Sequence, residues 1–301
     1  MYPGASRFEF VSQRYQGERP AIGCDGLVPG AALDLTHWQG NQTPSAFKAD
    51  TSTEIALKFV VAPESEPWSG AVVVNNHFDT DGILSAWTLL EPERALAERD
   101  LLVAAAEAGD FDEWPSEKRG LWLDSAIRAL AAREAGDAAA YKAVLPQLPE
   151  LVGTIGQRRD LWGAEWDQLE SAWSALESGH LRAERFGPVG LLVHPPGAAE
   201  APGALLARQF LPTAWRYLLA FDQGNGQYHY RYERPRYAWA VTVVREPIPA
   251  PDEESLIASL GPDWTTTGLP GLTSIAQTLH PIPEPPDQVI ERLIRLDRVA
   301  E

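Results

Sequence analysis

Apolar and polar residues form blocks along the chain, and each block has the period of a strand or of a helix. Residues 29–38 (PGAALDLTHW) predict a short buried strand followed by polar groups, and residues 70–74 (GAVVV) predict a second buried strand. Between them, Thr51 and Glu54 have the spacing of a capping box, which predicts a short helix over STEIALKFVV. The N-terminal part is therefore expected to combine buried strands with helices.

From Gly82 to Gly179 the pattern is almost wholly helical, because apolar residues recur every three or four positions. Gly179 is expected to end the last helix, since glycine readily adopts the left-handed conformation that follows helix C-termini. The predicted helices span residues 83–90, 93–108, 116–135, 137–144 and 158–178.

After residue 180 the period changes to that of strands. RAERF, VGLLVH and two segments around Gly224-Asn225-Gly226, a hairpin turn signal, predict strands. The two segments span residues 215–221 and 227–244, and helices are predicted over GALLARQFL and near 251–260 and 285–299. We therefore expect an α/β fold with a helix-rich middle region and an antiparallel C-terminal portion. The expected domains are an α/β domain over residues 1–180, which includes the helical segment, and an α+β domain over 181–301.

Composition and charge exclude several classes of partner and of site. The chain has 301 residues, 45% of them hydrophobic and 22% charged, as in soluble globular proteins. Its formal net charge of −17 repels phosphate backbones and anionic lipids, so extended nucleic acid and membrane surfaces are not expected as partners. A single cysteine excludes an intramolecular disulfide and a thiolate zinc cluster. No apolar run approaches the roughly 20 residues that span a bilayer, and no signal-peptide pattern is recognised, so a cytoplasmic location is expected. The oligomeric state stays open.

The segment with the strongest chemical signal is GAVVVNNHFDTDGILSAWTLL, residues 70–90. His77, Asp79 and Asp81 follow the predicted strand at alternate positions, and Gly82 precedes the predicted helix. Open α/β sheets place their ligands at the carboxyl ends of strands. One aspartate would suffice to cap the helix, whereas clustered carboxylates repel one another unless a cation neutralises them. The pattern therefore predicts that the histidine and both aspartates bind metal and carry catalysis.

This segment resembles the first motif of the DHH-type phosphoesterases, in which a strand is followed by His-x-Asp-x-Asp-Gly and a Ser-Ala pair. The matching residues in NHFDTDGILSA are His77, Asp79, Asp81, Gly82, Ser85 and Ala86. The resemblance implies two divalent cations, usually manganese, and hydrolysis of a phosphoester by a metal-activated water. Mixed histidine and carboxylate ligation suits Mn²⁺ better than Mg²⁺, which is the alternative. The expected substrate is a small anion, such as a phosphodiester or nucleotide, because the acidic chain disfavours long DNA.

Two other segments offer the further ligands that a two-metal site requires. An alanine-rich helix is predicted to end at Gly109 and to present Asp110, as in the segment near the last metal-linked aspartate of the DHH family. Asp34 and His37 lie at the end of the predicted strand over residues 29–38 and are also candidate metal ligands. Ordinary capping or pairing within a polar loop would explain each of these segments as well.

Alternative functions remain open at this level. The chain contains no Asp-His-His tripeptide, which leaves a catalytically incomplete, DHH-like binding protein as one alternative. The haloacid-dehalogenase-like phosphatases share Asp-x-Asp-Gly, but Ile83 stands where they have threonine. Zinc peptidases share His-x-Asp at a strand end and need a Glu-Glu pair, for which Glu253-Glu254 is the candidate. Both of these families leave more residues unexplained than a metal-dependent phosphoesterase does.

Overall fold

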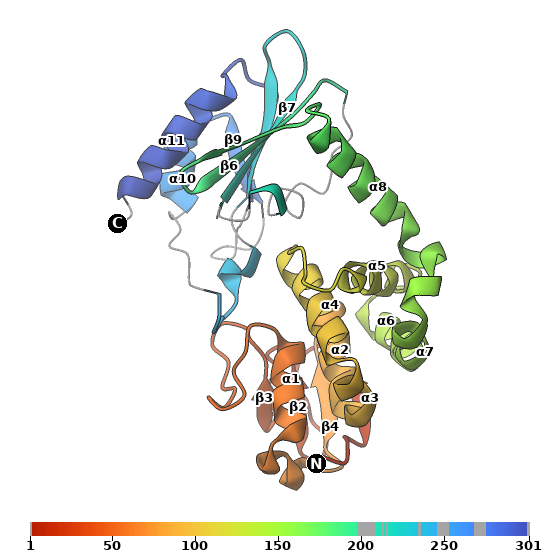
Figure 1. Cartoon of the computed structure of the whole chain (residues 1–301). Helices are drawn as coiled ribbons and strands as arrows, with labels where there is room; N and C mark the ends of the chain where they lie inside the picture. Colours follow the sequence, from red (N-terminus) through yellow and green to blue (C-terminus); the bar gives the residue numbers. More distant parts are fainter. Residues whose placement is uncertain are drawn as a thin grey trace. The chain divides into compact units, whose positions relative to one another are not determined.

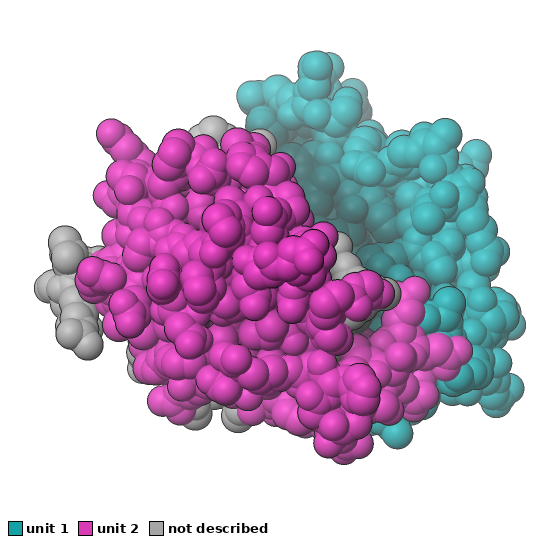
Figure 2. Space-filling model, turned by 90° about the horizontal axis from the view of Figure 1, so that it is seen from above, with its two compact units in different colours: residues 1–165, 240–246 teal, residues 166–239, 247–301 magenta. Residues whose placement is uncertain are grey.

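The computed structural model forms two compact units (Figure 2). Unit 1 comprises Met1–Glu165 and Ala240–Glu246, and unit 2 comprises Trp166–Trp239 and Pro247–Glu301. The boundary between residues 165 and 166 falls inside helix α8 (Arg159–Glu177). The division into domains at residue 180 stays a prediction. The structure describes residues 2–197, 209–211, 214, 216–233, 236–245, 253–267 and 275–299.

Unit 1 is built on a parallel sheet of four short strands in the order β1-β4-β2-β3. Every residue of β2 and β4 is buried, as expected for strands covered on both faces. The strands predicted over residues 29–38 and 70–74 are confirmed as β3 and β4, whereas β1 and β2 were not predicted. The strands are β1 (Arg7–Phe10), β2 (Ala21–Cys24), β3 (Leu33–Leu35) and β4 (Val72–Asn75).

Helices α1 and α2 lie beside this sheet (Figure 1). The central helix is α2, which is buried over ten consecutive residues and packs against α1, α4 and β4. Thr51 caps α1 as predicted, because its hydroxyl accepts the backbone N–H of Glu54 at 3.2 Å. The helix predicted over 93–108 is divided at Glu98. The helices are α1 (Ser52–Val61), α2 (Thr80–Leu90), α3 (Pro92–Ala97), α4 (Arg99–Phe111), α5 (Arg119–Ala131), α6 (Asp137–Val144) and α7 (Leu148–Thr154), with 3₁₀ turns η1 (Pro63–Trp68), η2 (Leu145–Gln147) and η3 (Ile155–Gln157).

Helices α4 and α5 approach each other closely at Gly120. A Cβ atom at this position would lie 2.6 Å from the backbone carbon of Ala104, a distance that real Cβ atoms do not adopt. We expect Gly120→Ala to lower the free energy of unfolding by about 1–3 kcal/mol, because the helices must separate. A Cβ atom at Gly153 in α7 would meet no packed neighbour within 4 Å. Gly153→Ala should therefore raise the free energy of unfolding by about 0.5–1 kcal/mol. Urea unfolding checks both, and equal stabilities of the Gly120 variant and the parent would contradict the packing described.

Unit 2 contains a six-stranded sheet in the order β5-β6-β7-β8-β10-β9. Its neighbouring strands are antiparallel except for β6 and β7, which are parallel. The predicted hairpin at Gly224-Asn225-Gly226 is confirmed, and all three residues have the positive φ that such a turn requires. The strands are β5 (Arg182–Phe186), β6 (Val189–His194), β7 (Arg216–Asp222), β8 (Tyr228–Glu233), β9 (Trp264–Thr267) and β10 (Ile275–Thr278), and the helical elements that follow β8 are η4 (Arg236–Trp239), α10 (Glu253–Leu260) and α11 (Pro286–Val299).

The α/β class with a helix-rich middle region is confirmed, and two predictions in unit 2 need correction or qualification. The strand predicted over residues 227–244 ends at Glu233, and a 3₁₀ turn with an irregular segment follows. The helix predicted over 203–211 lies largely outside the described residues. In the described part of the chain, every helix is too short or too polar to cross a lipid bilayer.

Candidate metal centre

Three neighbouring strands of the parallel sheet each end in a potential metal ligand. Asp25 directly follows β2, His37 lies two residues beyond β3, and His77 lies two residues beyond β4. The order β4-β2-β3 places Asp25 on the middle strand of the three. Because the carboxyl ends of parallel strands meet at one edge of a sheet, side chains from distant parts of the sequence converge there.

The turn after β2 aims the carboxylate of Asp25 at this edge. Asp25 has a φ of 63°, and its N–H donates to the carbonyl of Leu35 at 3.1 Å. The N–H of Gly26 donates to Asn75 Oδ1 at 3.1 Å, and a Cβ at Gly26 would lie 2.1 Å from Asn76 Oδ1. A larger residue at position 26 would displace the side chains of Asn75 and Asn76, so glycine allows the turn to approach the end of β4.

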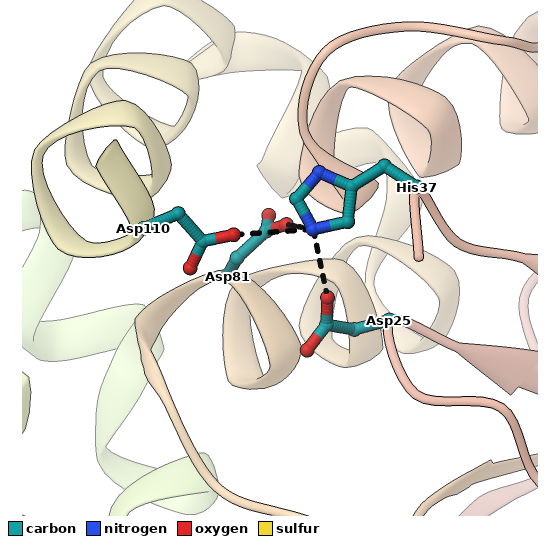
Figure 3. A group of neighbouring side chains, drawn as sticks. All are labelled: Asp25, His37, Asp81 and Asp110. Carbon is teal, nitrogen blue, oxygen red and sulfur yellow. Dashed lines mark ion pairs between the residues drawn. The ribbon is translucent and has the colours of Figure 1, made fainter. Parts of the chain in front are cut away.

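Four side chains form what we call the inner group: Asp25, His37, Asp81 and Asp110. Three carboxylates point at the same nitrogen, His37 Nε2 (Figure 3). The distances to this nitrogen are 3.5 Å from Asp25 Oδ1, 3.6 Å from Asp81 Oδ2 and 3.2 Å from Asp110 Oδ2. All four side chains are at most 5% exposed, so the inner group lies in a region of low dielectric.

Asp25 also belongs to an outer group, which contains His77 and Asp79. Its Oδ2 atom lies 2.8 Å from His77 Nε2, and Asp79 Oδ2 lies 3.1 Å from the same nitrogen. His77 and Asp79 are 24% and 39% exposed, whereas Asp25 is 1% exposed. The site is therefore more accessible to solvent at the outer group, where the Trp38 ring centroid lies 5.2 Å from that of His77.

Backbone N–H groups hold two of the aspartates in place. The carboxylate of Asp81 accepts from Ser52 N at 2.6 Å and from Thr53 N at 2.7 Å, at the start of α1. Asp79 Oδ1 accepts from Gly82 N at 2.7 Å and caps α2. The cap uses one oxygen of Asp79, and the other oxygen faces His77. Capping and metal ligation are therefore compatible at this residue.

The tautomer of His37 is set by the chain itself. Its Nδ1–H donates to the carbonyl oxygen of Asp50 at 2.5 Å. A carbonyl can only accept, so Nδ1 carries a proton and Nε2 is the nitrogen available to a metal ion. Asp110 lies in the last turn of α4, which continues to Phe111 instead of ending at Gly109 as predicted.

Charge is unbalanced across the two groups, which contain four aspartates and two histidines. Burial alone would lower the pKa of His77, but hydrogen bonds to Asp25 and Asp79 raise it to about 11. Burial would likewise lower the pKa of His37, but hydrogen bonds to Asp110 and Asp25 raise it well above its usual value. Burial and the charge of Asp25 raise the pKa of Asp81 to about 6. In the absence of a cation, protonation of these groups compensates for part of the negative charge.

The structure brings five of the six predicted site residues together and separates the sixth. Asp34 lies in the middle of β3, so its side chain points to the face opposite that of Leu35. Its Oδ2 accepts from Gln42 N at 3.2 Å, and Asp34 belongs to neither group, so its predicted role as a ligand does not agree with this geometry. Asp25, which joins the groups, was not predicted. The five residues brought together are His37, His77, Asp79, Asp81 and Asp110.

The donor atoms fit divalent cations. Within each group the potential ligand atoms all lie within 4.8 Å of one another. Asp25 Oδ2 and Asp110 Oδ2 are buried, and each faces a histidine ring nitrogen, at 2.8 Å and 3.2 Å, respectively. Buried carboxylate oxygens are normally hydrogen-bonded or coordinated to a metal. Each group could therefore hold a divalent ion through carboxylate oxygens and imidazole nitrogen.

Comparison with known proteins gives a family and a distant structural likeness. The chain is similar to the solved structure of PggH, a pGpG-specific phosphodiesterase from Vibrio cholerae, with 12% identity and a TM-score of 0.46. The match covers 93% of this chain and 84% of that chain. No curated protein matches the sequence. The model of the family described as "Family of unknown function (DUF6687)" matches residues 6–266, and the chain therefore belongs to this family.

Proposed function

We propose that this chain is a phosphoesterase that uses a pair of divalent cations to hydrolyse a small phosphodiester or nucleotide-like substrate. The observation that carries the proposal is the position of Asp25, whose two carboxylate oxygens face the inner and the outer group, respectively. A carboxylate shared in this way is suited to bridge two cations. Two-metal hydrolytic sites place their ions about 3.5–4 Å apart, which one bridging carboxylate can span.

Each of the two groups would hold one cation. The inner cation would be held by Asp25, His37, Asp81 and Asp110, and the outer cation by Asp25, His77 and Asp79. The resemblance to the DHH phosphoesterases supports this assignment at His77, Asp79 and Asp81. The mixture of imidazole and carboxylate ligands favours Mn²⁺, with Mg²⁺ as the alternative.

The chain's own residues prepare the site for such chemistry. Bound cations would lower the pKa of water and neutralise the charge that develops on phosphate. Ser52, Thr53 and Gly82 hold the aspartates through backbone N–H groups, so the ligands need little rearrangement. The outer group is the exposed one, so the substrate is expected to approach beside His77 and Trp38.

The absent Asp-His-His tripeptide does not prevent a complete ligand set. Asp25 and His37 both precede the first motif in the sequence, and the parallel sheet brings them to it. This order is reversed from that of the DHH family, in which further aspartate and histidine ligands follow the first motif. The net charge of −17 favours a small substrate over a long nucleic acid.

Metal analysis and a generic phosphodiester assay test the proposal. We expect the purified wild-type protein to retain about two Mn²⁺ ions and to hydrolyse a chromogenic phosphodiester only when Mn²⁺ is present. Asp79→Ala removes a ligand of the outer cation and should reduce the rate at least about a hundredfold, a change of roughly 2.7 kcal/mol. Equal background rates in both proteins, with cations bound to the wild type, would favour the catalytically incomplete binding protein instead.

A further inference from the structure

A short segment of the C-terminal half of the sequence belongs to unit 1. We call residues Ala240–Arg245 the strap. They belong to the second segment of unit 1, Ala240–Glu246, and the chain before and after this segment belongs to unit 2. The strap contacts the backbone beside an inner-group ligand: Val241 N donates to the carbonyl of His37 at 2.7 Å, and Ala240 pairs with Trp38 as a β-bridge. The strap is therefore attached to the loop that carries His37.

Asp50 connects the strap to the imidazole of the same histidine. Its carboxylate accepts the backbone N–H of Val243, that of Val244 at 2.9 Å and that of Arg245 at 3.0 Å. It also accepts Arg245 Nη1 at 2.7 Å. The carbonyl of Asp50 accepts His37 Nδ1, which directs Nε2 toward the inner group. One residue thus holds the strap with its side chain and orients a candidate metal ligand with its backbone.

Arg245 extends this connection to α4, the helix that carries Asp110. Its guanidinium donates to Glu107 at 2.8 Å and to Glu113 at 2.7 and 3.0 Å, on either side of Asp110 in the sequence. It also lies 4.8 Å from the ring centroid of Phe111, whose ring lies 5.9 Å from that of His37. Arg245 therefore ties the last turn of α4 to Asp50.

Arg245 itself is not placed to bind substrate. Its side chain is 16% exposed, and its guanidinium is engaged by three carboxylates and one aromatic ring. The three carboxylates, Asp50, Glu107 and Glu113, lie outside the inner and outer groups. Arg245 thus contacts residues that neighbour the candidate ligands. Residues around a metal site commonly fix the orientation of its ligands through such contacts.

We propose that the strap, through Arg245 and Asp50, positions His37 and Asp110 and so sets the affinity of the inner cation, while the outer cation does not depend on it. This inference rests on the proposed two-cation site. It makes Arg245 a positioning residue and predicts an asymmetry: the same substitution should affect one cation and spare the other. The outer ligands His77 and Asp79 have no contact with the strap among the interactions described.

Titration of metal-free protein with Mn²⁺, followed by calorimetry and by the electron paramagnetic resonance of free Mn²⁺, tests this asymmetry. We expect Arg245→Met to weaken the inner site about 10- to 100-fold, the range found when residues that orient metal ligands are replaced, and to leave the outer site unchanged. The His77→Ala background assigns the sites, because only the inner one should then remain strong. Arg245→Lys should restore part of the affinity, since lysine keeps the charge without the planar fork.

Arg182→Met is the matched control. Arg182 also joins two carboxylates, Glu184 at 3.0 Å and Asp287 at 3.4 Å; all three residues belong to unit 2, and neither carboxylate belongs to the inner or outer group. Both Mn²⁺ affinities of this variant should equal those of the wild type. If Arg245→Met does not fold, as judged by cooperative thermal unfolding without metal, Asp50→Asn serves in its place, because it retains the carbonyl that accepts His37 Nδ1.

The outcomes separate the two proposals. Equal inner-site affinity in the wild type and the strap variant, or an equal loss at both sites, would overturn the role of the strap. Wild-type protein that binds two cations and hydrolyses no phosphoester would overturn the proposed function and leave this inference standing, since the titration does not depend on turnover.

Discussion

Asp25→Asn is expected to cause the largest loss of any single substitution in the site. One carboxylate faces both groups, so its removal should prevent the binding of the cation pair. We expect hydrolysis of the phosphodiester substrate to fall at least about a thousandfold, because the cation pair is worth several kcal/mol of transition-state stabilisation. Metal content per chain and steady-state rates at saturating Mn²⁺ measure both effects.

Asp34→Asn is the matched control for this substitution. Asp34 also lies in the parallel sheet, in the edge strand β3, but its carboxylate accepts from Gln42 N and belongs to neither group. The variant should retain two cations and the wild-type rate. Loss of a cation in Asp34→Asn, or two cations retained in Asp25→Asn, would contradict the ligand set given above.

The second large effect is a steep dependence of metal affinity on pH. Without a cation, hydrogen bonds to aspartates raise the pKa of His77 to about 11 and keep His37 protonated at neutral pH. An imidazolium cannot coordinate a metal, so loading both sites must release about two protons. The product of the two association constants should therefore rise about a hundredfold per pH unit near neutral pH, where both histidines are protonated in the metal-free protein.

At lower pH the dependence becomes steeper. The pKa of Asp81 is about 6, so below this value a further proton competes with the inner cation. Calorimetry in two buffers that differ in ionisation enthalpy measures the protons released at each pH. Proton release near zero at neutral pH would show that the histidines do not exchange their protons for metal.

The first motif could be predicted because its signal is local. His77, Asp79 and Asp81 occupy alternate positions shortly after three consecutive buried valines, and both the strand and the polar residues that follow it are visible in the sequence. His37 follows a shorter strand in the same manner. The geometry that brings His37 beside Asp81 depends on parallel pairing between strands, which no local pattern encodes.

Asp25 was missed because its strand is short and its turn is ordinary. β2 has four residues, two of them glycine and cysteine, and Asp25-Gly26 resembles a common turn dipeptide. The available signal was an aspartate directly after a short apolar run, the same arrangement as at His37. The prediction of Asp34 as a ligand did not take into account the alternation of side chains along a strand, which places its carboxylate outside both groups.

The strap could not be predicted either. After Gly226, Tyr228, Tyr230 and Tyr232 alternate with polar residues, and this period of two predicted a strand over residues 227–244. In the structure, backbone N–H groups of the strap bond instead to the carboxylate of Asp50 and to the carbonyl of His37. These partners lie about 200 residues earlier in the sequence, a separation at which periodicity carries no information.

Anomalous diffraction from crystals of the wild-type protein grown with Mn²⁺ would test the central claim most directly. We predict two manganese peaks about 3.5–4 Å apart, with one oxygen of Asp25 coordinated to each. The inner peak should contact His37, Asp81 and Asp110, and the outer peak should contact His77 and Asp79. No peak at the ends of β2, β3 and β4, or one ion that Asp25 does not coordinate, would contradict the account.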